Sequence, residues 1–281
     1  MNNSGLLLEL LASEHPLVMP DAYDALSARL IEMAGFKAIQ CSGFSMALAS
    51  STAAEPALGF QRNLQITKSI VDAVGVPVMA DGEDGFGPPE QVFETVGAFL
   101  DIGVSGINIE DQVVSETSER RLTEPGVMSA KLAAARAAAT DHKMDLLINA
   151  RTDALAHASD GGEGVKEAVK RGNRYRQAGA DLIFVTGVKT LDEVKTLVNE
   201  IDGPVSIAAG MPQNMDAMSI QELRDCGVAR VSLPSILLFS AIQAVKRSLA
   251  VVRDTERFDE LSSRDFLCGM SEVGAILKKK S

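Results

Sequence analysis

The sequence predicts one (β/α)8 barrel, a TIM barrel, in which eight parallel strands alternate with helices. Its 281 residues slightly exceed the roughly 250 that are typical of such a barrel. Short β-rich runs alternate with longer amphipathic segments, which is the pattern of a parallel sheet with crossover helices. Several amphipathic segments end at a glycine that leads into an apolar run, and glycine just past a helix end can close the helix. A doubly wound open sheet is the alternative architecture.

The expected elements follow one another without a flexible linker or a low-complexity segment. Strands are expected at residues 17–19, 38–41, 76–80, 106–109, 146–150, 182–185, 205–208 and 231–233. Amphipathic helices are expected at residues 24–33, 64–74, 89–100, 131–140, 164–177, 191–200 and 219–225. The second, fourth, sixth and eighth strands are preceded by Gly35, Gly103, Gly179 and Gly227.

Residues 1–281 are therefore expected to form a single barrel domain with a C-terminal helical extension that begins at about residue 237. This extension contains more material than one closing helix needs. Its apolar residues Leu249, Val252 and Phe258 require a partner, and a neighbouring subunit would supply one. The sequence thus predicts a homo-oligomer.

Composition restricts the classes of partner. The net charge of −11 disfavours nucleic acid and anionic membranes, and Trp is absent, so stacking on bases is not expected. The three cysteines are far apart and form no CxxC pair, which fits a reducing cytoplasm. Glu9 and Glu14 interrupt the first apolar run, so it is interpreted as a short amphipathic helix rather than a signal peptide.

Acidic residues follow two neighbouring strands at their carboxyl ends, where barrel enzymes place their active sites. Asp81 and Glu83 are two residues apart in a glycine-rich stretch, and Glu110 and Asp111 end the next strand. Clustered carboxylates repel one another unless a cation neutralises them, and hard oxygen ligands suit Mg2+, with Mn2+ as a substitute. The alternative is that these acids only cap the following helices in solvent.

Two further strand ends offer groups for an anionic substrate. Arg151 follows the fifth strand and would hold a carboxylate with paired hydrogen bonds, or else form a salt bridge to Asp153 or Glu110 that only fixes the loop. After the second strand, the backbone N–H groups around Gly43 and Phe44 would receive an oxyanion, although a Ser-Gly turn after a strand is common.

Five segments together resemble the isocitrate lyase/phosphoenolpyruvate mutase superfamily, from about residue 10 to 249. They are DAYDALSAR (21–29), SGFSMA (42–47), DGEDGFG (81–87), GINIED (106–111) and NARTDA (149–154). The resemblance implies an α/β barrel whose eighth helix is swapped between paired subunits, usually in a tetramer that is a dimer of swapped dimers. It also implies Mg2+ and substrates such as methylisocitrate, dimethylmalate, oxaloacetate or phosphonopyruvate.

The resemblance also implies roles for individual residues. Asp81 would ligate Mg2+ directly, while Glu83 and Glu110 would hold its water shell. The remaining implied residues contact the substrate: Ser42, Gly43 and Phe44 would bind its 2-oxo carboxylate and oxyanion, Asp81 would meet it through the metal, and Arg151 would act beside the breaking bond as a catalytic residue.

The sequence departs from the superfamily at the gate loop. Lyases of the superfamily carry Lys-x-Cys-Gly-His, whose Cys protonates the leaving enolate; here Glu116 stands at the Lys, Ser118 at the Cys and Arg120 at the His. Glu116 and Ser118 are the catalytic candidates of this loop, although a hydroxyl is a far weaker acid than a thiol. Thr186 stands where relatives have Glu or His, as a substrate contact or a packing residue. Small residues at 208–210 indicate a smaller or more apolar acid than a tricarboxylate.

The resulting expectation is a Mg2+-dependent carbon–carbon lyase that acts beside a 2-oxo or 2-hydroxy acid, such as a substituted malate, through an enolate. Oxaloacetate decarboxylation and phosphonopyruvate hydrolysis or phosphonomutase chemistry are the second hypothesis, because neither needs the missing Cys. A barrel that binds Mg2+ and an oxo acid without catalysis is the third.

Overall fold

Eight parallel strands close into a barrel in the computed structural model, which describes residues 5–52, 55–114, 120–263 and 266–278. All eight expected strands are confirmed, with ends shifted by at most three residues. The strands are, in order around the barrel, β1 (Leu17–Ala22), β10 (Arg230–Leu233), β9 (Val205–Ala208), β8 (Leu182–Val185), β7 (Leu147–Thr152), β4 (Gly106–Glu110), β3 (Val78–Asp81) and β2 (Ile39–Cys41).

The register between neighbouring strands brings the candidate residues to one rim. Asp81 of β3 is paired with Asn108 of β4, and Glu110 of β4 is paired with Arg151 of β7. Because all these strands run in the same direction, their carboxyl ends meet at the same end of the barrel. The acidic residues and Arg151 therefore lie close together at this rim, as the order of the strands led us to expect.

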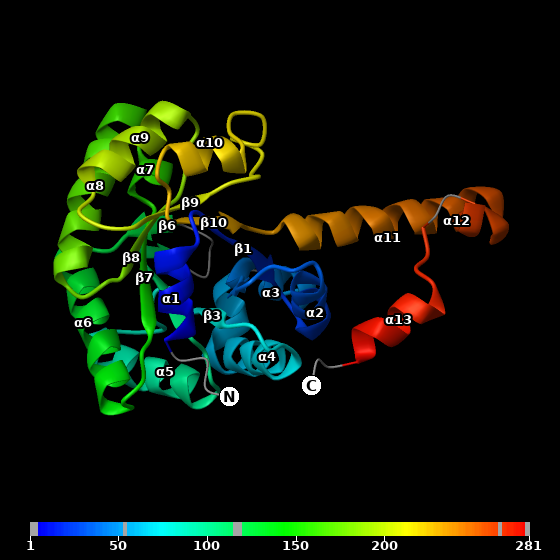
Figure 1. Cartoon of the computed structure of the whole chain (residues 1–281), viewed down its shortest axis with the longest axis horizontal. Helices are drawn as coiled ribbons and strands as arrows, with labels where there is room; N and C mark the ends of the chain where they lie inside the picture. The colour runs from blue at the N-terminus through cyan, green and yellow to red at the C-terminus, as the bar shows by residue number, and fades with distance from the viewer. Residues whose placement is uncertain (1–4, 53–54, 115–119, 264–265, 279–281) are drawn as a thin grey trace.

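Helices surround the barrel and pack their apolar sides against it (Figure 1). They are α2 (Ala25–Met33), α4 (Gly59–Ala73), α5 (Pro89–Asp101), α6 (Pro125–Asp141), α8 (Gly161–Gln177), α9 (Leu191–Glu200) and α10 (Ile220–Asp225), with the short α3 (Gly43–Ala49), η1 (Glu55–Leu58) and α7 (Ala154–His157) at the rim. The helix expected at 131–140 begins six residues earlier, because Pro125 occupies a first-turn position where its missing N–H costs nothing.

The N-terminal helix α1 (Leu6–Ser13) closes the end of the barrel opposite the candidate site. Its residues Leu7 and Leu11 are buried in a cluster with Leu17, Met79 and Leu147, which come from the strands. The expectation of a short amphipathic helix at this position is confirmed. Helix α1 thus covers the amino end of the barrel, and the cavities beside the candidate residues lie at the carboxyl end.

A small hairpin follows β4 and was not anticipated from the sequence. It consists of β5 (Gln112–Val114) and β6 (Arg120–Leu122), which pair antiparallel with Val113 opposite Arg121. The hairpin rises directly from the strand that carries Glu110 and Asp111. It therefore stands beside the candidate site.

The C-terminal helices do not complete the ring around the barrel. Helix α11 (Ile236–Thr255) extends away from it, and after α12 (Asp259–Ser263) the chain returns with α13 (Met270–Leu277) toward α2 (Figure 1). Arg29 of α2 donates hydrogen bonds to the carbonyls of Ile276 and Lys278. Within the part of the chain that the structure describes, no helix has both the length and the apolar character that a membrane span requires.

Candidate active site

Asp81 lies at the carboxyl end of β3 and is held by three donors. The Gly43 N–H donates to Oδ2 at 2.8 Å, while the Glu83 N–H and Asn108 Nδ2 donate to Oδ1 at 3.3 and 3.4 Å. Gly43 is the first residue of α3, so the positive end of a short helix faces this carboxylate. The Gly43 N–H, which was expected to receive a substrate oxyanion, instead donates to Asp81.

The loop after Asp81 folds only because of its glycines. At Gly82 an added Cβ would lie 2.7 Å from the Asn108 carbonyl oxygen, and Gly85 has a φ of +92°. Glu83 itself has a φ of 49°, a backbone conformation that residues other than glycine rarely adopt. This turn directs the Glu83 carboxylate to Gly43, where an added Cβ would overlap it. Asp81 and Glu83 therefore approach the same point above α3.

Arg151 is enclosed by two acids at the neighbouring rim. Its Nη1 lies 2.7 Å from Glu110 Oε2, and its Nε and Nη2 donate to Asp153 at 2.8 and 2.9 Å. Burial lowers the pKa of Arg151, but Asp153 and Glu110 outweigh it and raise the pKa well above its ordinary value. The guanidinium thus stays charged, and both salt bridges considered from the sequence are present.

Asp153 links Arg151 to the next strand. Thr186, which follows β8, donates to Asp153 Oδ1 at 2.7 Å and also lines the cavity described below. Burial raises the pKa of Asp153, but the Arg151 charge and the hydrogen bonds from Arg151 and Thr186 lower it overall. Asp153 therefore stays ionised and fixes the orientation of Arg151.

A second buried network lies directly behind these residues and centres on Asp111. Thr152 Oγ1, the Asp153 N–H, Arg171 Nη1 and Tyr175 Oη donate to its two oxygens at 2.8 to 3.0 Å. Asp111 has no solvent exposure. It ties the end of β4 to the end of β7 and to α8, and thereby fixes the segment that carries Arg151.

The barrel interior beneath the site contains a buried cation. Arg230, which is 1% exposed, donates to Gln40 Oε1 at 3.0 Å and to Ser206 Oγ at 3.1 Å. Burial lowers its pKa to about 10, against the opposing attraction of Asp21 and Asp81. Arg230 therefore remains a fixed positive charge at neutral pH.

Phe184 of β8 lies between the floor and the rim of the site. Its ring centroid is 5.4 Å from the guanidinium carbon of Arg230 and 6.0 Å from that of Arg151. At these separations a cation is attracted to the face of an aromatic ring. The ring thus contributes to the placement of both cations and forms part of the cavity wall.

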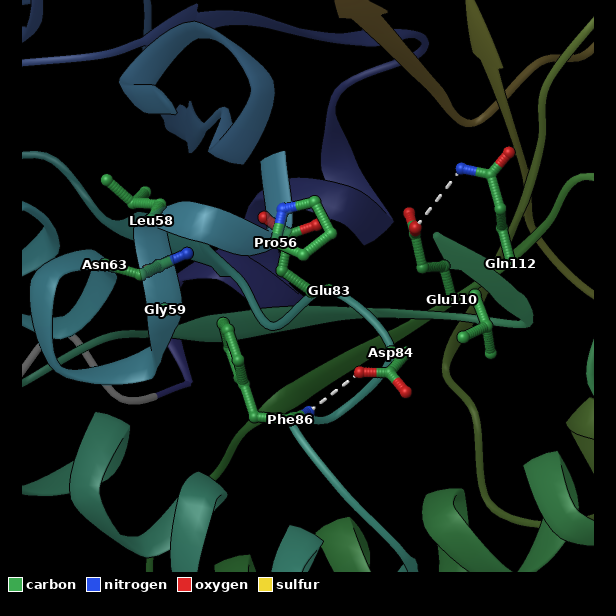
Figure 2. A pocket seen from close by; sticks show the side chains of 10 residues that line it. Pro56, Leu58, Gly59, Asn63, Glu83, Asp84, Phe86, Glu110 and Gln112 are labelled. Atoms are coloured by element: carbon green, nitrogen blue, oxygen red, sulfur yellow. Dashed lines mark hydrogen bonds between the residues drawn. The ribbon is translucent and has the colours of Figure 1, made fainter. Parts of the chain in front are cut away.

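Two cavities adjoin the acidic residues. The central cavity, of about 290 Å³, is lined by Asp21, Ser42, Phe44, Asp81, Asn108, Arg120, Arg151, Phe184, Thr186, Met211, Ser232 and Phe239, among others. The side cavity, of about 150 Å³, lies by Glu83 and Glu110 and is closed by Asn63, Phe86 and Leu58 (Figure 2). Asp81 thus faces one cavity, while Glu83 and Glu110 face the other.

The oxygen-only donor set fits Mg2+ but not a closed metal site. Among the described residues, no three His, Cys, Asp or Glu side chains converge tightly enough to enclose an ion. Mg2+ usually keeps several waters and needs only one or two carboxylates, whereas a structural zinc site needs four protein ligands. Asp81 and Glu83 approach one point beside Gly43, and two like charges so placed favour a cation between them.

The expected substrate-binding residues of α3 are at the cavity. Ser42 caps this helix by accepting from the Ser45 N–H at 3.2 Å, and it lines the central cavity together with Phe44. Phe44 also makes an edge-to-face contact with Phe239 of α11, with 6.4 Å between ring centroids. The start of α11 therefore contributes to the cavity wall.

The gate-loop candidates Glu116 and Ser118 lie outside the described residues. The neighbouring Arg120 on β6 does line the central cavity, and its Nη1 donates to Gln112 Oε1 at 3.1 Å. Gln112 in turn donates to Glu110 at 3.5 Å (Figure 2). The hairpin thus connects a cation at the cavity mouth to the acidic rim.

Two residues of the candidate site were missed from the sequence, Asp21 and Arg230, while Asp111 was expected only as one of the acids at the rim. Asp21 lies one residue before the end of β1, so the strand-end rule that selected Asp81 would also have selected it. Arg230 begins its strand and points into the barrel. In strands buried on both faces, the sequence pattern does not reveal which residues face inward.

The chain is similar to known proteins in sequence and in structure. The model of the phosphoenolpyruvate phosphomutase family matches residues 7–253. A 2,3-dimethylmalate lyase of Eubacterium barkeri is 33% identical over 208 residues, which cover 72% of this chain and 70% of that protein. A 2-methylisocitrate lyase of Aeropyrum pernix is 32% identical over 264 residues, covering 90% and 80%.

Among solved structures, a phosphonopyruvate hydrolase in complex with oxalate and Mg2+ superposes with a TM-score of 0.84. The identity is 28%, and the match covers 98% of this chain and 95% of that one.

Proposed function

Since this chain belongs to the phosphoenolpyruvate mutase/isocitrate lyase superfamily, we propose that it is a Mg2+-dependent carbon–carbon lyase. Its substrate is a small substituted malate or a related 2-hydroxy or 2-oxo acid, cleaved through an enolate. The observation that carries the proposal is the rim at which Asp81 and Arg151 line the central cavity while Glu83 and Glu110 line the adjoining side cavity. Two lyases at 32–33% identity support the reaction type.

Asp81 would ligate Mg2+ directly, and Glu83 and Glu110 would hold the water around it. Bound there, the ion supplies positive charge for the negative charge that develops on the substrate oxygen. The solved relative that contains oxalate and Mg2+ supports the choice of this ion.

Besides the metal ion, the positive charge of the Arg151 side chain would contact the substrate. It is preorganised by Asp153 and Glu110 and lines the central cavity, so no side-chain ordering is needed when an anion arrives. Its remaining N–H groups are the donors for a substrate carboxylate. Ser42 lines the same cavity and would also contact the substrate.

The cavity wall favours a small acid with an apolar substituent. Phe44, Phe184, Met211 and Phe239 contribute apolar surface, and Thr186 is already engaged with Asp153. A third carboxylate would find little compensation against such a wall, because burying an unpaired charge is costly. A dicarboxylate with methyl or similar branches is the better match.

Decarboxylation of oxaloacetate or hydrolysis of phosphonopyruvate is the second candidate. The observation that favours it is Ser118, which replaces the thiol that lyases use as proton donor. The similarity to a phosphonopyruvate hydrolase supports it as well. A barrel that binds Mg2+ and an oxo acid without catalysis is the third candidate.

Incubation with a panel of acids separates these candidates. Substituted malates, methylisocitrate, oxaloacetate and phosphonopyruvate are each supplied with Mg2+, and the 2-oxo acid or phosphate formed is measured, with EDTA as the control. Release of a 2-oxo acid from a substituted malate, abolished by EDTA, is expected. Turnover of only oxaloacetate or phosphonopyruvate would replace the lyase by the second candidate, and oxalate binding without any turnover would support the third.

We also propose that α11 is exchanged between paired subunits, in a dimer of swapped dimers. The support is an exposed apolar stripe on α11, formed by Ile242, Val245 and Leu249, and a second one on α2, formed by Leu26, Leu30 and Met33. Both stripes have the spacing of one helix face.

The cysteines of the described chain are all free, which fits the cytoplasm as the compartment.

A further inference from the structure

Asp21 is a buried carboxylate that lines the floor of the central cavity, at the end of β1. It is 6% exposed. Ser232 of β10 donates to its Oδ1 at 3.1 Å. Its second oxygen, Oδ2, has no hydrogen-bond partner among the described residues. Because Asp21 lines the cavity, an oxygen without a protein partner is available there to a ligand.

Arg230 attracts Asp21 from below but offsets its burial only in part, since burial still raises the pKa of Asp21 to about 7. Asp81 repels Asp21 and Arg151 attracts it, both more weakly. Arg230 donates hydrogen bonds to the neutral groups of Gln40 and Ser206 and forms no close ion pair with Asp21. The floor thus already holds one cation, and one acceptor on it lacks a protein partner.

The Arg230 cation and the unpartnered oxygen of Asp21 together determine which chemical group the floor accepts. A substrate carboxylate or phosphonate would be repelled by Asp21, and an ammonium group would duplicate the charge of Arg230. A hydroxyl brings one donor and no net charge, which is what Oδ2 lacks. A ketone oxygen at the same position has no proton to donate and would leave Oδ2 unpaired.

We propose that Asp21 recognises the 2-hydroxyl of the substrate by accepting its hydrogen bond, which makes the enzyme selective for 2-hydroxy acids over 2-oxo acids. This assignment rests on the proposed function, because the hydroxyl is that of the acid to be cleaved. It deepens that function by separating substituted malates from oxaloacetate and phosphonopyruvate, which carry a keto group.

The test compares two ligands that differ only in the hydroxyl, 3-methylmalate and 2-methylsuccinate. Their affinities for the full-length protein are measured by calorimetry with saturating Mg2+ at pH 8. Burial raises the pKa of Asp21 to about 7, so the carboxylate is mostly ionised at that pH. Hydrogen bonds to charged groups are strong enough for the wild type to prefer 3-methylmalate by about tenfold or more.

Two variants show whether Asp21 causes the preference. Asp21→Asn should reduce it to roughly twofold or less, since an amide is a weaker, uncharged acceptor. Ser206→Ala is the matched control: it removes one hydrogen bond of Arg230 without touching Asp21, and the preference should persist. A wild type without the preference, or an Asp21→Asn variant that retains it in full, overturns the assignment.

Turnover of 3-methylmalate by the wild type is followed separately as release of 2-oxo acid. A hydroxyl preference that depends on Asp21 but occurs without turnover contradicts the proposed lyase and supports the floor assignment. Turnover together with an unchanged hydroxyl preference in Asp21→Asn supports the proposed lyase and contradicts the assignment of Asp21. The two failures are therefore distinguishable.

Discussion

Gly43 occupies the narrowest point of the acidic rim. Its N–H donates to Asp81, and its missing side chain leaves the space that the Glu83 carboxylate occupies. Its φ is not in the left-handed region, so proximity to Glu83, rather than backbone strain, requires glycine here. The placement of Glu83 depends on this one missing methyl group.

Gly43→Ala should therefore displace Glu83 and lower kcat/KM by roughly 100-fold, the scale expected for a misplacement of about 1 Å in a catalytic group. Steady-state assays with Mg2+ and circular dichroism measure activity and fold. Gly274→Ala in α13 is the control, because nothing lies within 4 Å of its added Cβ. Full activity in Gly43→Ala would show that Glu83 has no role.

Asp21 gives the folded protein a particular pH dependence. Burial raises its pKa from 3.8 to about 7, so between these values the folded state binds a proton that the unfolded state has lost. The contribution of Asp21 to stability is therefore present at low pH and is lost as the pH rises toward 7. Each unit of the shift corresponds to about 1.4 kcal/mol.

Asp21→Asn should remove the loss of folding stability that the ionisation of Asp21 causes as the pH rises. In EDTA, the free energy of unfolding of the variant relative to the wild type should rise by about 2–3 kcal/mol between pH 5 and pH 8. Urea unfolding at the two pH values measures it. An unchanged difference between the two proteins would mean that Asp21 is ionised in the folded state throughout this range.

At the scale of elements, Asp111 joins β4, β7 and α8. Asn at this position would turn one of the two buried acceptor oxygens into an NH2 donor that faces either the Asp153 N–H or the Arg171 and Tyr175 donors. Asp111→Asn should cost about 2–4 kcal/mol of stability, measured by urea unfolding, and should also raise KM through Arg151. Glu167→Gln, which breaks a half-exposed ion pair of the same Arg171, should cost less than about 1 kcal/mol. Equal losses in both variants would contradict the organising role of Asp111.

The strands were predictable from the sequence because each is a short apolar run that ends in a polar or glycine-rich turn. For the same reason the strand ends at Asp81, Glu110 and Arg151 could be assigned to one rim. The β5–β6 hairpin could not be predicted, since its few residues carry no clear alternation. The position of Arg230 inside the barrel was also beyond the sequence, because it depends on which face of a fully buried strand points inward.

At the scale of the whole molecule, α11 extends away from the barrel and leaves its apolar stripe exposed. Val245 and Leu249 are 58% and 65% exposed, which is unfavourable for a helix that carries such a stripe. In the proposed exchange these residues are buried against another copy. The start of the same helix contributes Phe239 to the central cavity, so assembly and the site are linked.

Val245→Glu should weaken the assembly by roughly 100-fold or more, because it buries an unpaired charge in the interface. Light scattering after size exclusion should show smaller species than the wild type, while circular dichroism stays unchanged. Lys246→Glu, at the adjacent exposed position, is the control and should assemble normally. A monomeric wild type would refute the exchange.

We propose that the acids at adjoining strand ends tolerate each other because they share a divalent ion. Calorimetric titration of Mg2+ into the metal-free protein with oxalate present measures this sharing, with Asp81→Ala as the variant and Asp192→Ala on exposed α9 as the control. A single saturable site is expected in the wild type and in Asp192→Ala, and no binding is expected in Asp81→Ala. Mg2+ binding by Asp81→Ala with wild-type affinity would refute the shared ion.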